Sequence, residues 1–180
     1  MKAKIAILGG DGIGPEVTAE AMKVMEAIGS RYGHEFEYST GPVGGNAIDD
    51  FGDALPDQTR DVVLASDAVL FGAVGGPQWD DPAAKTRPED GILELRKTLG
   101  LFANLRPVKV YPELIDASPL RPERLEGVDL IIVRELTGGL YFGKPKKRWK
   151  TSRGRRAVDT LKYTEQEIAR VLRVGFELAM

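Results

Sequence analysis

The first 33 residues contain an apolar run, a glycine-rich turn and an amphipathic segment, and this succession constrains the fold more than any other feature. Residues 2–8 (KAKIAIL) predict a short buried strand. The turn GGDGIG follows, and Pro15 stands where the first helical position tolerates proline. A helix is predicted from there to about Gly33, because apolar residues recur at spacings of three and four: Val17, Ala21, Val24, Met25 and Ile28.

Predicted strands and helices alternate along the rest of the chain. The strands are expected at 36–39, 68–74, 102–110 and 129–136, of which 68–74 and 129–136 read as buried. The helices are expected at 56–65, at 91–99 and after Thr164, which forms a capping-box pattern with Glu167. This alternation predicts an α/β fold with an open, mostly parallel sheet and flanking helices.

The residue inventory excludes several classes of protein. The 180 residues include no Cys and a single His, His34, which excludes disulfides, thiolate zinc sites and His-pair metal sites and disfavours a Ser-His-Asp triad. The longest apolar stretch, 68–74, is far shorter than the roughly 20 residues that span a bilayer. The apolar run at the N-terminus is too short for a signal peptide. We therefore expect a cytoplasmic protein with no membrane partner.

One segment of the chain is strongly basic. Residues 144–156 (KPKKRWKTSRGRR) contain eight basic residues and no acidic one, which leaves 17 basic against 27 acidic residues elsewhere. A nucleic-acid-binding domain usually has a broad positive face, so we expect no nucleic-acid partner. Two interpretations of the segment stay open: a solvated loop, or a docking strip for an acidic partner surface or a polyanion.

Two glycine-rich stretches resemble phosphate-binding motifs but fail on inspection. The run from Gly10 to Gly14 lies between a predicted strand and helix, but Pro15 stands where a dinucleotide fingerprint needs Gly or Ala. The run from Gly138 to Lys144 is close to a Walker A loop, but Pro145 follows where a Ser or Thr hydroxyl is required. We therefore predict either a tight turn or a backbone role near a ligand at the first run, and no nucleotide hydrolysis at the second.

Three arginines beside apolar strands or on an amphipathic helix are the candidates for ligand binding: Arg96, Arg106 and Arg134. A guanidinium that leaves water must meet an anion, and arginine holds carboxylates in a planar, two-pronged geometry. Three converging arginines would suit a small di- or tricarboxylate. The alternative is that each pairs with a local acid, such as Glu135 or Glu94, or extends its charged end into solvent. Five residues beyond the last predicted strand, Tyr141 is either a proton donor or a packing residue.

Four ordered blocks resemble the 3-isopropylmalate dehydrogenase family of β-decarboxylating dehydrogenases: residues 7–17 (ILGGDGIGPEV), 72–80 (GAVGGPQWD), 101–112 (LFANLRPVKVYP) and 133–145 (VRELTGGLYFGKP). The resemblance implies the isocitrate/isopropylmalate dehydrogenase-like fold, incomplete here because the C-terminal half is absent. Residues 1–99 would belong to a first, cofactor-side domain, and residues 100–180 to a second domain that binds substrate and dimerises. It also implies NAD-dependent oxidation and decarboxylation of (2R,3S)-3-isopropylmalate, with Mg²⁺ or Mn²⁺, in leucine biosynthesis.

The resemblance also assigns roles to individual residues. It implies that the three arginines bind the malate carboxylates and hydroxyl, and that Tyr141 protonates the enolate. The stretch from Gly76 to Glu89 would border the nicotinamide, with Gly76, Pro77 and Glu89 contacting the cofactor. Ile92 and Leu93 match an apolar pocket for the isopropyl group, a pocket that discriminates only modestly among substrates.

Chains of this family are roughly twice as long, and their lysine base, metal ligands and adenosine-binding loop lie further along. No metal ligand is therefore assigned in this chain, and we expect residues 1–180 alone to lack activity and to expose apolar surface. The family also places an arm, here at about 137–160, that pairs with a second subunit in a homodimer. The alternatives are a non-catalytic binding or assembly module of the same fold, or a tartrate, homoisocitrate or isocitrate dehydrogenase.

Overall fold

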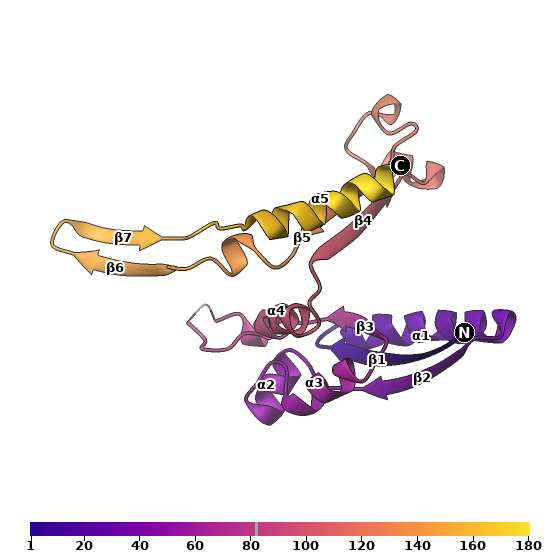
Figure 1. Cartoon of the computed structure of the whole chain (residues 1–180), viewed down its shortest axis with the longest axis horizontal. Coiled ribbons are helices and arrows are strands. Elements are labelled where there is room, and N and C mark those ends of the chain that lie inside the picture. Colours follow the sequence, from indigo (N-terminus) through magenta and orange to yellow (C-terminus); the bar gives the residue numbers. More distant parts are fainter. Residues whose placement is uncertain (82) are drawn as a thin grey trace. The chain divides into compact units, whose positions relative to one another are not determined.

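A computed structural model describes residues 1–81 and 83–180, which divide into two units, Met1–Gly100 and Leu101–Met180 (Figure 1). The first unit is built on a parallel sheet in the order β2-β1-β3. Its strands are β1 (Lys2–Gly10), β2 (Glu35–Thr40) and β3 (Ala68–Ala73). Its α-helices are α1 (Gly14–Tyr32), α2 (Gly45–Phe51), α3 (Asp57–Leu64) and α4 (Pro88–Thr98), and η1 (Pro77–Trp79) is a single 3-10 turn.

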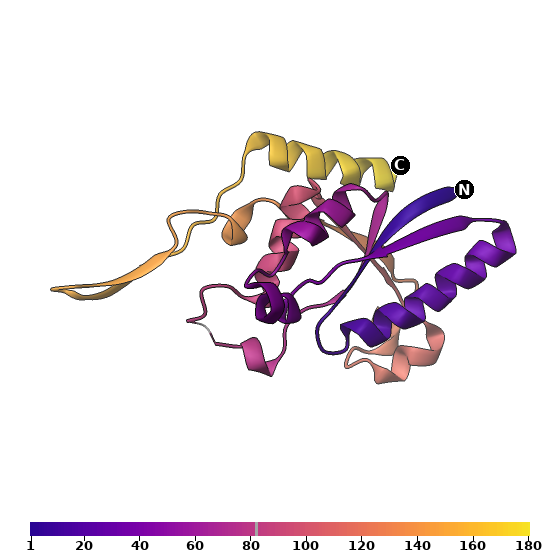
Figure 2. The ribbon, with the colours of Figure 1, turned by 90° about the horizontal axis from the view of Figure 1, so that it is seen from below.

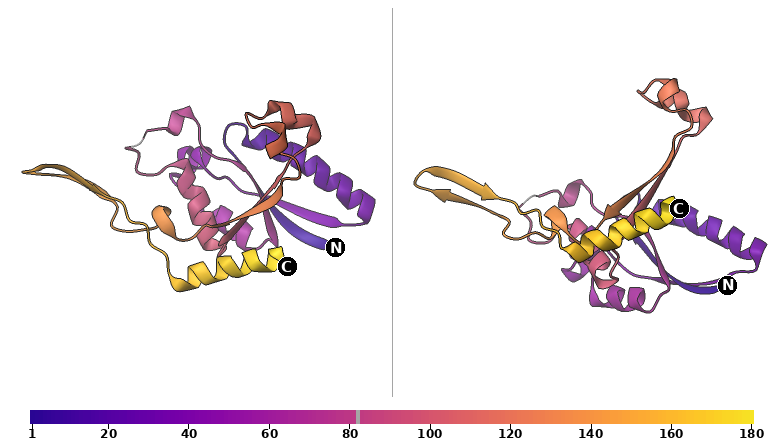
Figure 3. Two further views of the ribbon diagram at one scale, coloured as in Figure 1. Left: turned by 90° about the horizontal axis from the view of Figure 1, so that it is seen from above. Right: turned by 45° about the horizontal axis from the view of Figure 1, so that its top comes forward.

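The strand β1 lies in the middle of this sheet and is buried on both faces. Ala6 and Leu8 pack into a core with residues of α3, α4 and the loop after β2. Ile5 and Ile7 alternate onto the other face, which α1 covers (Figure 3). The expected parallel sheet with flanking helices is confirmed in this unit, because a buried apolar strand joined through a helix to its neighbour favours parallel pairing.

The face that α1 presents to the sheet differs from the expected one. Thr18 and Gly29 are buried, whereas Val24 and Ile28 are 58% and 42% exposed. Small residues face the sheet because the backbones approach closely there: a Cβ at Gly72 would lie 2.7 Å from the carbonyl oxygen of Gly14. The predicted apolar stripe of α1 is therefore largely exposed. The helix ends as predicted at Gly33, whose φ of 68° is left-handed.

The second unit contains two antiparallel strand pairs and one long helix (Figure 2). The first pair is β4 (Ala103–Lys109) with β5 (Asp129–Glu135), joined through the 3-10 turns η2 (Pro112–Ala117) and η3 (Pro122–Arg124). After β5 come η4 (Gly139–Tyr141), the hairpin of β6 (Lys147–Thr151) with β7 (Gly154–Val158), and α5 (Glu165–Ala179), which packs beside β5.

The pairing and burial of β5 differ from the expectation of a buried strand in a parallel sheet. The connection from β4 to β5 contains no crossover helix, which a parallel pair would need, so the chain folds back antiparallel. Leu130, Ile131 and Ile132 are each about half exposed. The expected exposure of apolar surface by residues 1–180 is thus seen on β5.

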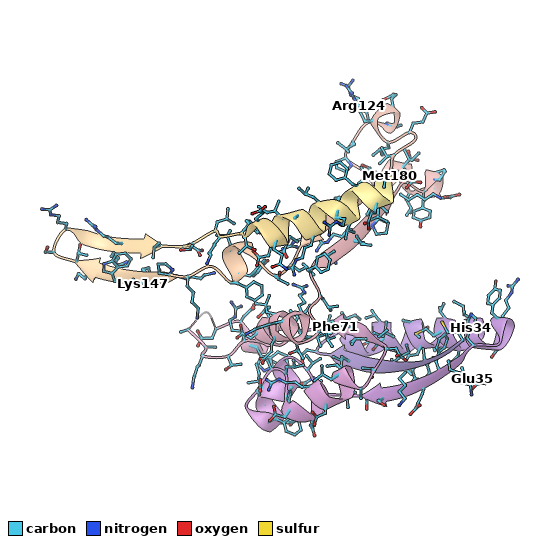
Figure 4. The ribbon with its side chains drawn as sticks, viewed as in Figure 1. His34, Glu35, Phe71, Arg124, Lys147 and Met180 are labelled. Carbon is cyan, nitrogen blue, oxygen red and sulfur yellow. The ribbon has the colours of Figure 1, made fainter. Side chains whose placement is uncertain are left out.

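The basic segment forms the hairpin β6–β7, which extends away from α5, with Lys147 on its first strand (Figures 1 and 4). Trp149 pairs across the hairpin with Arg156, and the Lys147 ammonium lies 5.3 Å from the centre of the Trp149 ring. The cationic side chains remain exposed. The expectation of a loop is therefore corrected to an exposed two-stranded ribbon, whose turn at Ser152 and Arg153 carries no strong hairpin signal.

The predicted start of the last helix is confirmed in detail. The Thr164 N–H donates to Glu167 Oε2 at 2.7 Å, and the Glu167 N–H donates to Thr164 Oγ1 at 3.3 Å. This reciprocal pair is the capping box that the sequence predicts. Beyond it, the apolar residues Ile168 and Leu172 are about half exposed on the predicted face.

Candidate functional site

A cavity of about 610 Å³ lies in the second unit between β5, the turn that follows it and α5. Arg106, Arg134 and Tyr141 line it, together with Tyr163 and apolar residues of α5 such as Ile168. The cavity thus combines two guanidinium groups and two phenol groups with an apolar wall. Such a surface can bind a small anion that also carries an alkyl group.

The antiparallel register of β4 and β5 brings the two arginines to one face. Arg106 lies opposite Ile132, and Asn104 lies opposite Arg134, so all four side chains share that face. The Arg106 Nε–H donates to Asn104 Oδ1 at 2.6 Å. The guanidinium of Arg134 lies 5.9 Å from the centre of the Tyr141 ring. The arrangement leaves several guanidinium N–H donors available for an anion.

The alternative in which these arginines pair with local acids is wrong for Arg106 and Arg134. Within residues 101–180 neither forms an ion pair, and Glu135 pairs instead with Arg170 at 2.9 Å. In the first unit, Glu94 forms an ion pair with Arg60 at 3.0 Å. Within residues 101–180, no ion pair therefore neutralises either arginine of the cavity.

Glu135 is a residue of this region whose contacts the sequence analysis missed. Burial alone raises the pKa of its carboxyl, but hydrogen bonds from the Thr137 hydroxyl, the Gly138 N–H, Arg170 and the Thr137 N–H outweigh burial and hold the pKa below its ordinary value. The available signal was its position two residues before Thr137, which begins a Thr-Gly-Gly turn. A carboxylate in such a place commonly accepts backbone N–H groups.

The remaining predicted substrate residues lie on α4 in the first unit. Ile92, Leu93 and Arg96 are all partly buried. Spacings of three and four residues place both apolar side chains beside Arg96 on one side of the helix. The helix lies close to the core at Gly91, where a Cβ would lie 2.5 Å from the carbonyl oxygen of Ala54.

Asp11 holds the loop that begins the predicted cofactor segment. Its carboxylate is 1% exposed and accepts hydrogen bonds from the N–H groups of Gly45 at 2.6 Å, Asn46 at 2.8 Å and Gly75 at 2.8 Å. Nearby, the Trp79 indole N–H donates to Asp49 Oδ1 at 3.2 Å. The loop after β3 is thus joined to α2 at two points, through Asp11 at its start and through Asp49 further along.

The first glycine-rich run has a packing role. A Cβ at Gly14 would lie 2.7 Å from the Ala73 N atom, and Gly10 has φ of 77° and faces the Ala73 carbonyl. The glycines let the turn approach β3, while the Asp11 carboxylate occupies the N–H groups at the start of α2. The tight-turn interpretation is confirmed, and no pyrophosphate cradle is formed by these groups.

The second glycine-rich run also forms no phosphate loop. The Gly139 N–H donates to the Lys162 carbonyl, and the Gly143 N–H donates to the Gly139 carbonyl, both at 2.9 Å. The run forms the 3-10 turn η4 rather than the start of a helix. Its rejection as a Walker A loop is confirmed.

Among the residues predicted to contact a cofactor, Glu89 is the one with a charged side chain. Glu89 is an exposed carboxylate on the first turn of α4, and its Oε1 lies 3.6 Å from the position of a Cβ on Gly75. A carboxylate there, beside Gly76 and Pro77, is suited to accept hydrogen bonds from ribose hydroxyls. Residue 82, inside the predicted nicotinamide segment, lies outside the described residues.

No group of three or more His, Cys, Asp or Glu residues in the described ranges 1–81 and 83–180 could hold a metal ion. The described residues therefore supply no complete set of ligands for Mg²⁺ or Mn²⁺. Among the helices of the same ranges, none combines the length and apolar character needed to cross a membrane.

The structure gathers the predicted site residues in two groups. Arg106, Arg134 and Tyr141 line one cavity of the second unit. In the first unit, α4 carries Arg96 and the apolar pair, while the loop after β3 carries Gly76 and Pro77. The convergence of both groups on one ligand stays a prediction.

Comparisons with known proteins agree over almost the whole chain. The family model for isocitrate/isopropylmalate dehydrogenase matches residues 4–180. A 3-isopropylmalate dehydrogenase of Anaeromyxobacter dehalogenans (strain 2CP-C) is 58% identical over 179 residues, which are 99% of this chain and 51% of that protein. A 3-isopropylmalate dehydrogenase of Bacillus subtilis (strain 168) is 54% identical over 180 residues, covering 99% and 49%. The chain spans about half the length of the curated relatives it matches.

Solved structures share the fold. The isocitrate dehydrogenase of Methylococcus capsulatus superimposes with a TM-score of 0.77 at 29% identity, covering 98% of this chain and 47% of that one. A β-decarboxylating dehydrogenase of Thermococcus kodakarensis gives a TM-score of 0.63 at 34% identity, covering 97% and 44%.

Proposed function

The chain belongs to the isocitrate/isopropylmalate dehydrogenase family, and from that premise we propose that it carries the substrate-binding arginines and the proton donor of an NAD-dependent 3-isopropylmalate dehydrogenase. The reaction is the oxidation of the C2 hydroxyl of (2R,3S)-3-isopropylmalate and the loss of its β-carboxylate, which yields 4-methyl-2-oxopentanoate and carbon dioxide. The observation that carries the proposal is the cavity lined by Arg106, Arg134 and Tyr141.

The two arginines would bind the dianionic substrate. Each guanidinium presents paired N–H donors whose geometry matches a carboxylate, and neither is neutralised by an acid of its own unit. Arg96 on α4 would supply a third cation from the first unit. Binding of this kind orients the substrate and offsets its charge as carbon dioxide departs.

Tyr141 would donate the proton that completes the reaction. After decarboxylation the carbon that lost its carboxylate carries excess electron density as an enolate, and the phenol Oη–H is a suitable acid for it. Proton transfer leaves negative charge on Oη, and the Arg134 guanidinium beside the ring offsets that charge. The pairing of these two residues thus supports both substrate binding and protonation.

Bound NAD would supply the hydride acceptor for the oxidation. Gly76 and Pro77 would border its nicotinamide, and the exposed Glu89 carboxylate would accept hydrogen bonds from its ribose. The Asp11 contact with Gly75 holds this loop in place next to the start of α2. This chain's own contribution to the cofactor site is therefore a prearranged loop and one carboxylate.

The apolar pair on α4 supports an alkyl-substituted substrate. Isocitrate carries a third carboxylate where 3-isopropylmalate carries its isopropyl group, and Ile92 and Leu93 offer that carboxylate no polar partner. The relatives at 58% and 54% identity are named 3-isopropylmalate dehydrogenases, whereas the isocitrate dehydrogenase structure is 29% identical. A cytoplasmic homodimer that pairs through the arm at 137–160, acting in leucine biosynthesis, is part of the same proposal.

The test is an assay of the protein expressed from its complete reading frame. Purified protein is mixed with NAD, Mg²⁺ and 3-isopropylmalate, and the formation of NADH is followed by its absorbance, with isocitrate, tartrate and homoisocitrate as competing substrates. We expect the highest kcat/KM with 3-isopropylmalate. A higher value with another of these substrates would reassign the substrate, and no NADH with any of them would favour a non-catalytic binding module.

A further inference from the structure

We propose that Glu135 is a positioning residue that holds the turn from Thr137 to Tyr141 so that the Tyr141 phenol stands beside Arg134 over the cavity. The inference deepens the proposed function and rests on it, because it assigns the support of the proton donor. Glu135 lines the same cavity as Tyr141, but the turn and Arg170 already occupy both of its carboxylate oxygens. It acts through the backbone of the turn.

The contacts of Glu135 are concentrated on that turn. Its Oε2 accepts the N–H groups of Thr137 and Gly138, both at 2.7 Å, and its Oε1 accepts the Thr137 hydroxyl at 2.6 Å. The side chain is 8% exposed. A nearly buried carboxylate that takes two successive backbone N–H groups fixes the direction in which the chain leaves β5.

Arg170 ties the same carboxylate to α5. Its Nη2 lies 2.9 Å from Glu135 Oε1 and also contacts the Thr137 hydroxyl. The guanidinium lies 4.7 Å from the centre of the Phe102 ring, which fixes its position from a second side. The turn is thus held between the end of β5 and the long helix.

The far side of the turn rests on Tyr163. A Cβ at Gly138 would lie 2.7 Å from Tyr163 Cδ1, and one at Gly139 would lie 2.5 Å from its hydroxyl oxygen. The Gly139 N–H also donates to the Lys162 carbonyl at 2.9 Å. Both glycines therefore lie directly against the residues that precede α5.

Tyr141 follows this anchored turn without a break. The Gly143 N–H donates to the Gly139 carbonyl at 2.9 Å and closes η4, the short 3-10 turn that carries Tyr141. Among the described residues, no side-chain hydrogen bond holds the exposed Tyr141 phenol. Its position therefore depends on the backbone of η4. A change at Glu135 that lets the turn shift will move Tyr141 relative to Arg134.

Charge at Glu135 is needed as well as shape. Three donors approach its two oxygens from the turn and a fourth from Arg170, so both oxygens must accept. A glutamine would present an NH₂ group to at least one of these donors and leave it unsatisfied. Glu135→Gln is therefore a nearly isosteric change that loosens the turn.

A double-mutant cycle with Tyr141→Phe tests the proposal in the protein from its complete reading frame, assayed with 3-isopropylmalate, NAD and Mg²⁺. We expect Glu135→Gln to lower kcat about tenfold when Tyr141 is intact and less than about twofold in the Tyr141→Phe background, with KM changed less than about threefold. Equal losses in both backgrounds would overturn the proposal, because Glu135 would then act on the fold and not through Tyr141. Glu177→Gln, on the exposed part of α5, is the matched control.

Two further measurements cover the other outcomes. If Glu135→Gln does not fold, Thr137→Val removes one of the donors and should give a smaller loss with the same dependence on Tyr141; a loss independent of Tyr141 would overturn the proposal. If the unsubstituted protein produces no NADH, the proposed function fails on its own. The fluorine NMR resonance of 3-fluorotyrosine at position 141 then decides the positioning role, since an unchanged resonance in Glu135→Gln would contradict it.

Discussion

The guanidinium carbon of Arg134 lies 5.9 Å from the centre of the Tyr141 ring, although seven positions separate the two residues along the chain. Arg134 is near the end of β5, and Tyr141 is the last residue of η4. The turn between them folds back over the cavity and brings a cation next to a phenol. An anion bound by Arg134 would therefore lie within reach of a proton donor.

Removal of the Tyr141 hydroxyl should slow protonation while leaving substrate binding largely intact. We expect Tyr141→Phe to lower kcat by about 10²–10⁴-fold, the range typical of general acids, with a much smaller change in KM. The control is Tyr111→Phe, because Tyr111 is exposed to a similar degree in the same unit but lies outside the cavity. Steady-state kinetics on the protein from its complete reading frame would refute the role if both variants behaved alike.

Replacement of Arg106 by lysine should weaken substrate binding although the charge is kept. Lysine cannot bind a carboxylate in two-pronged fashion, so we expect Arg106→Lys to raise KM for 3-isopropylmalate about tenfold or more. Arg124 lies in η3, away from the cavity, and Arg124→Lys should leave KM unchanged (Figure 4). An unchanged KM in Arg106→Lys would place the substrate elsewhere.

Truncation of the apolar pair on α4 should reduce the preference for an alkyl-substituted substrate. We expect Leu93→Ala to lower the ratio of kcat/KM for 3-isopropylmalate to that for malate by about tenfold, within the roughly 1–3 kcal/mol that a few methylene contacts supply. The exposed Leu64 on α3 provides the control substitution, Leu64→Ala. If the unsubstituted protein, Leu93→Ala and Leu64→Ala gave equal ratios of kcat/KM for the two substrates, Leu93 would not contact the alkyl group.

Asp11 should matter for stability more than any exposed acid of the first unit. An asparagine side chain accepts hydrogen bonds through one oxygen, so it cannot accept from all three backbone N–H groups that Asp11 binds. We therefore expect Asp11→Asn to lower the free energy of unfolding by about 2–4 kcal/mol. Asp61→Asn, on the exposed side of α3, should change it by less than about 0.5 kcal/mol. Urea denaturation followed by circular dichroism measures both, and similar midpoints would contradict the role of Asp11.

The low pKa of Glu135 predicts a specific loss of stability in acid. Its ionised form stabilises the folded state fully above the unfolded-state pKa of about 4.3, and that contribution is lost as the pH falls through the lower folded-state pKa. The difference in unfolding free energy between the unsubstituted protein and Glu135→Gln should therefore be constant near neutral pH and shrink below about pH 5. Urea midpoints at several pH values check this, and a difference that is independent of pH would contradict it.

Local patterns in the sequence were enough to predict most of the regular structure. The helix from Pro15 to Gly33, the capping box of α5 and the parallel strands of the first unit were all predicted, because each depends on spacing, turn residues and apolar runs within a few positions. The short helix α2 and the hairpin β6–β7 were missed. The start of α2 and the turn of the hairpin carry only weak local signals of secondary structure. The shape of the hairpin is decided by the pairing of its two strands.

The sequence by itself determined the family, the alternation of strands and helices and the identity of the charged and phenolic residues that the site proposal uses. Only the tertiary structure decided what the buried carboxylates bind. Asp11 joins Gly75 across 64 positions, and Glu135 pairs with Arg170 across 35 positions rather than with the neighbouring Arg134. The physical reason is that a carboxylate in a low-dielectric site bonds to whichever donors the fold brings within about 3 Å of it, and their separation along the chain carries no information about that distance.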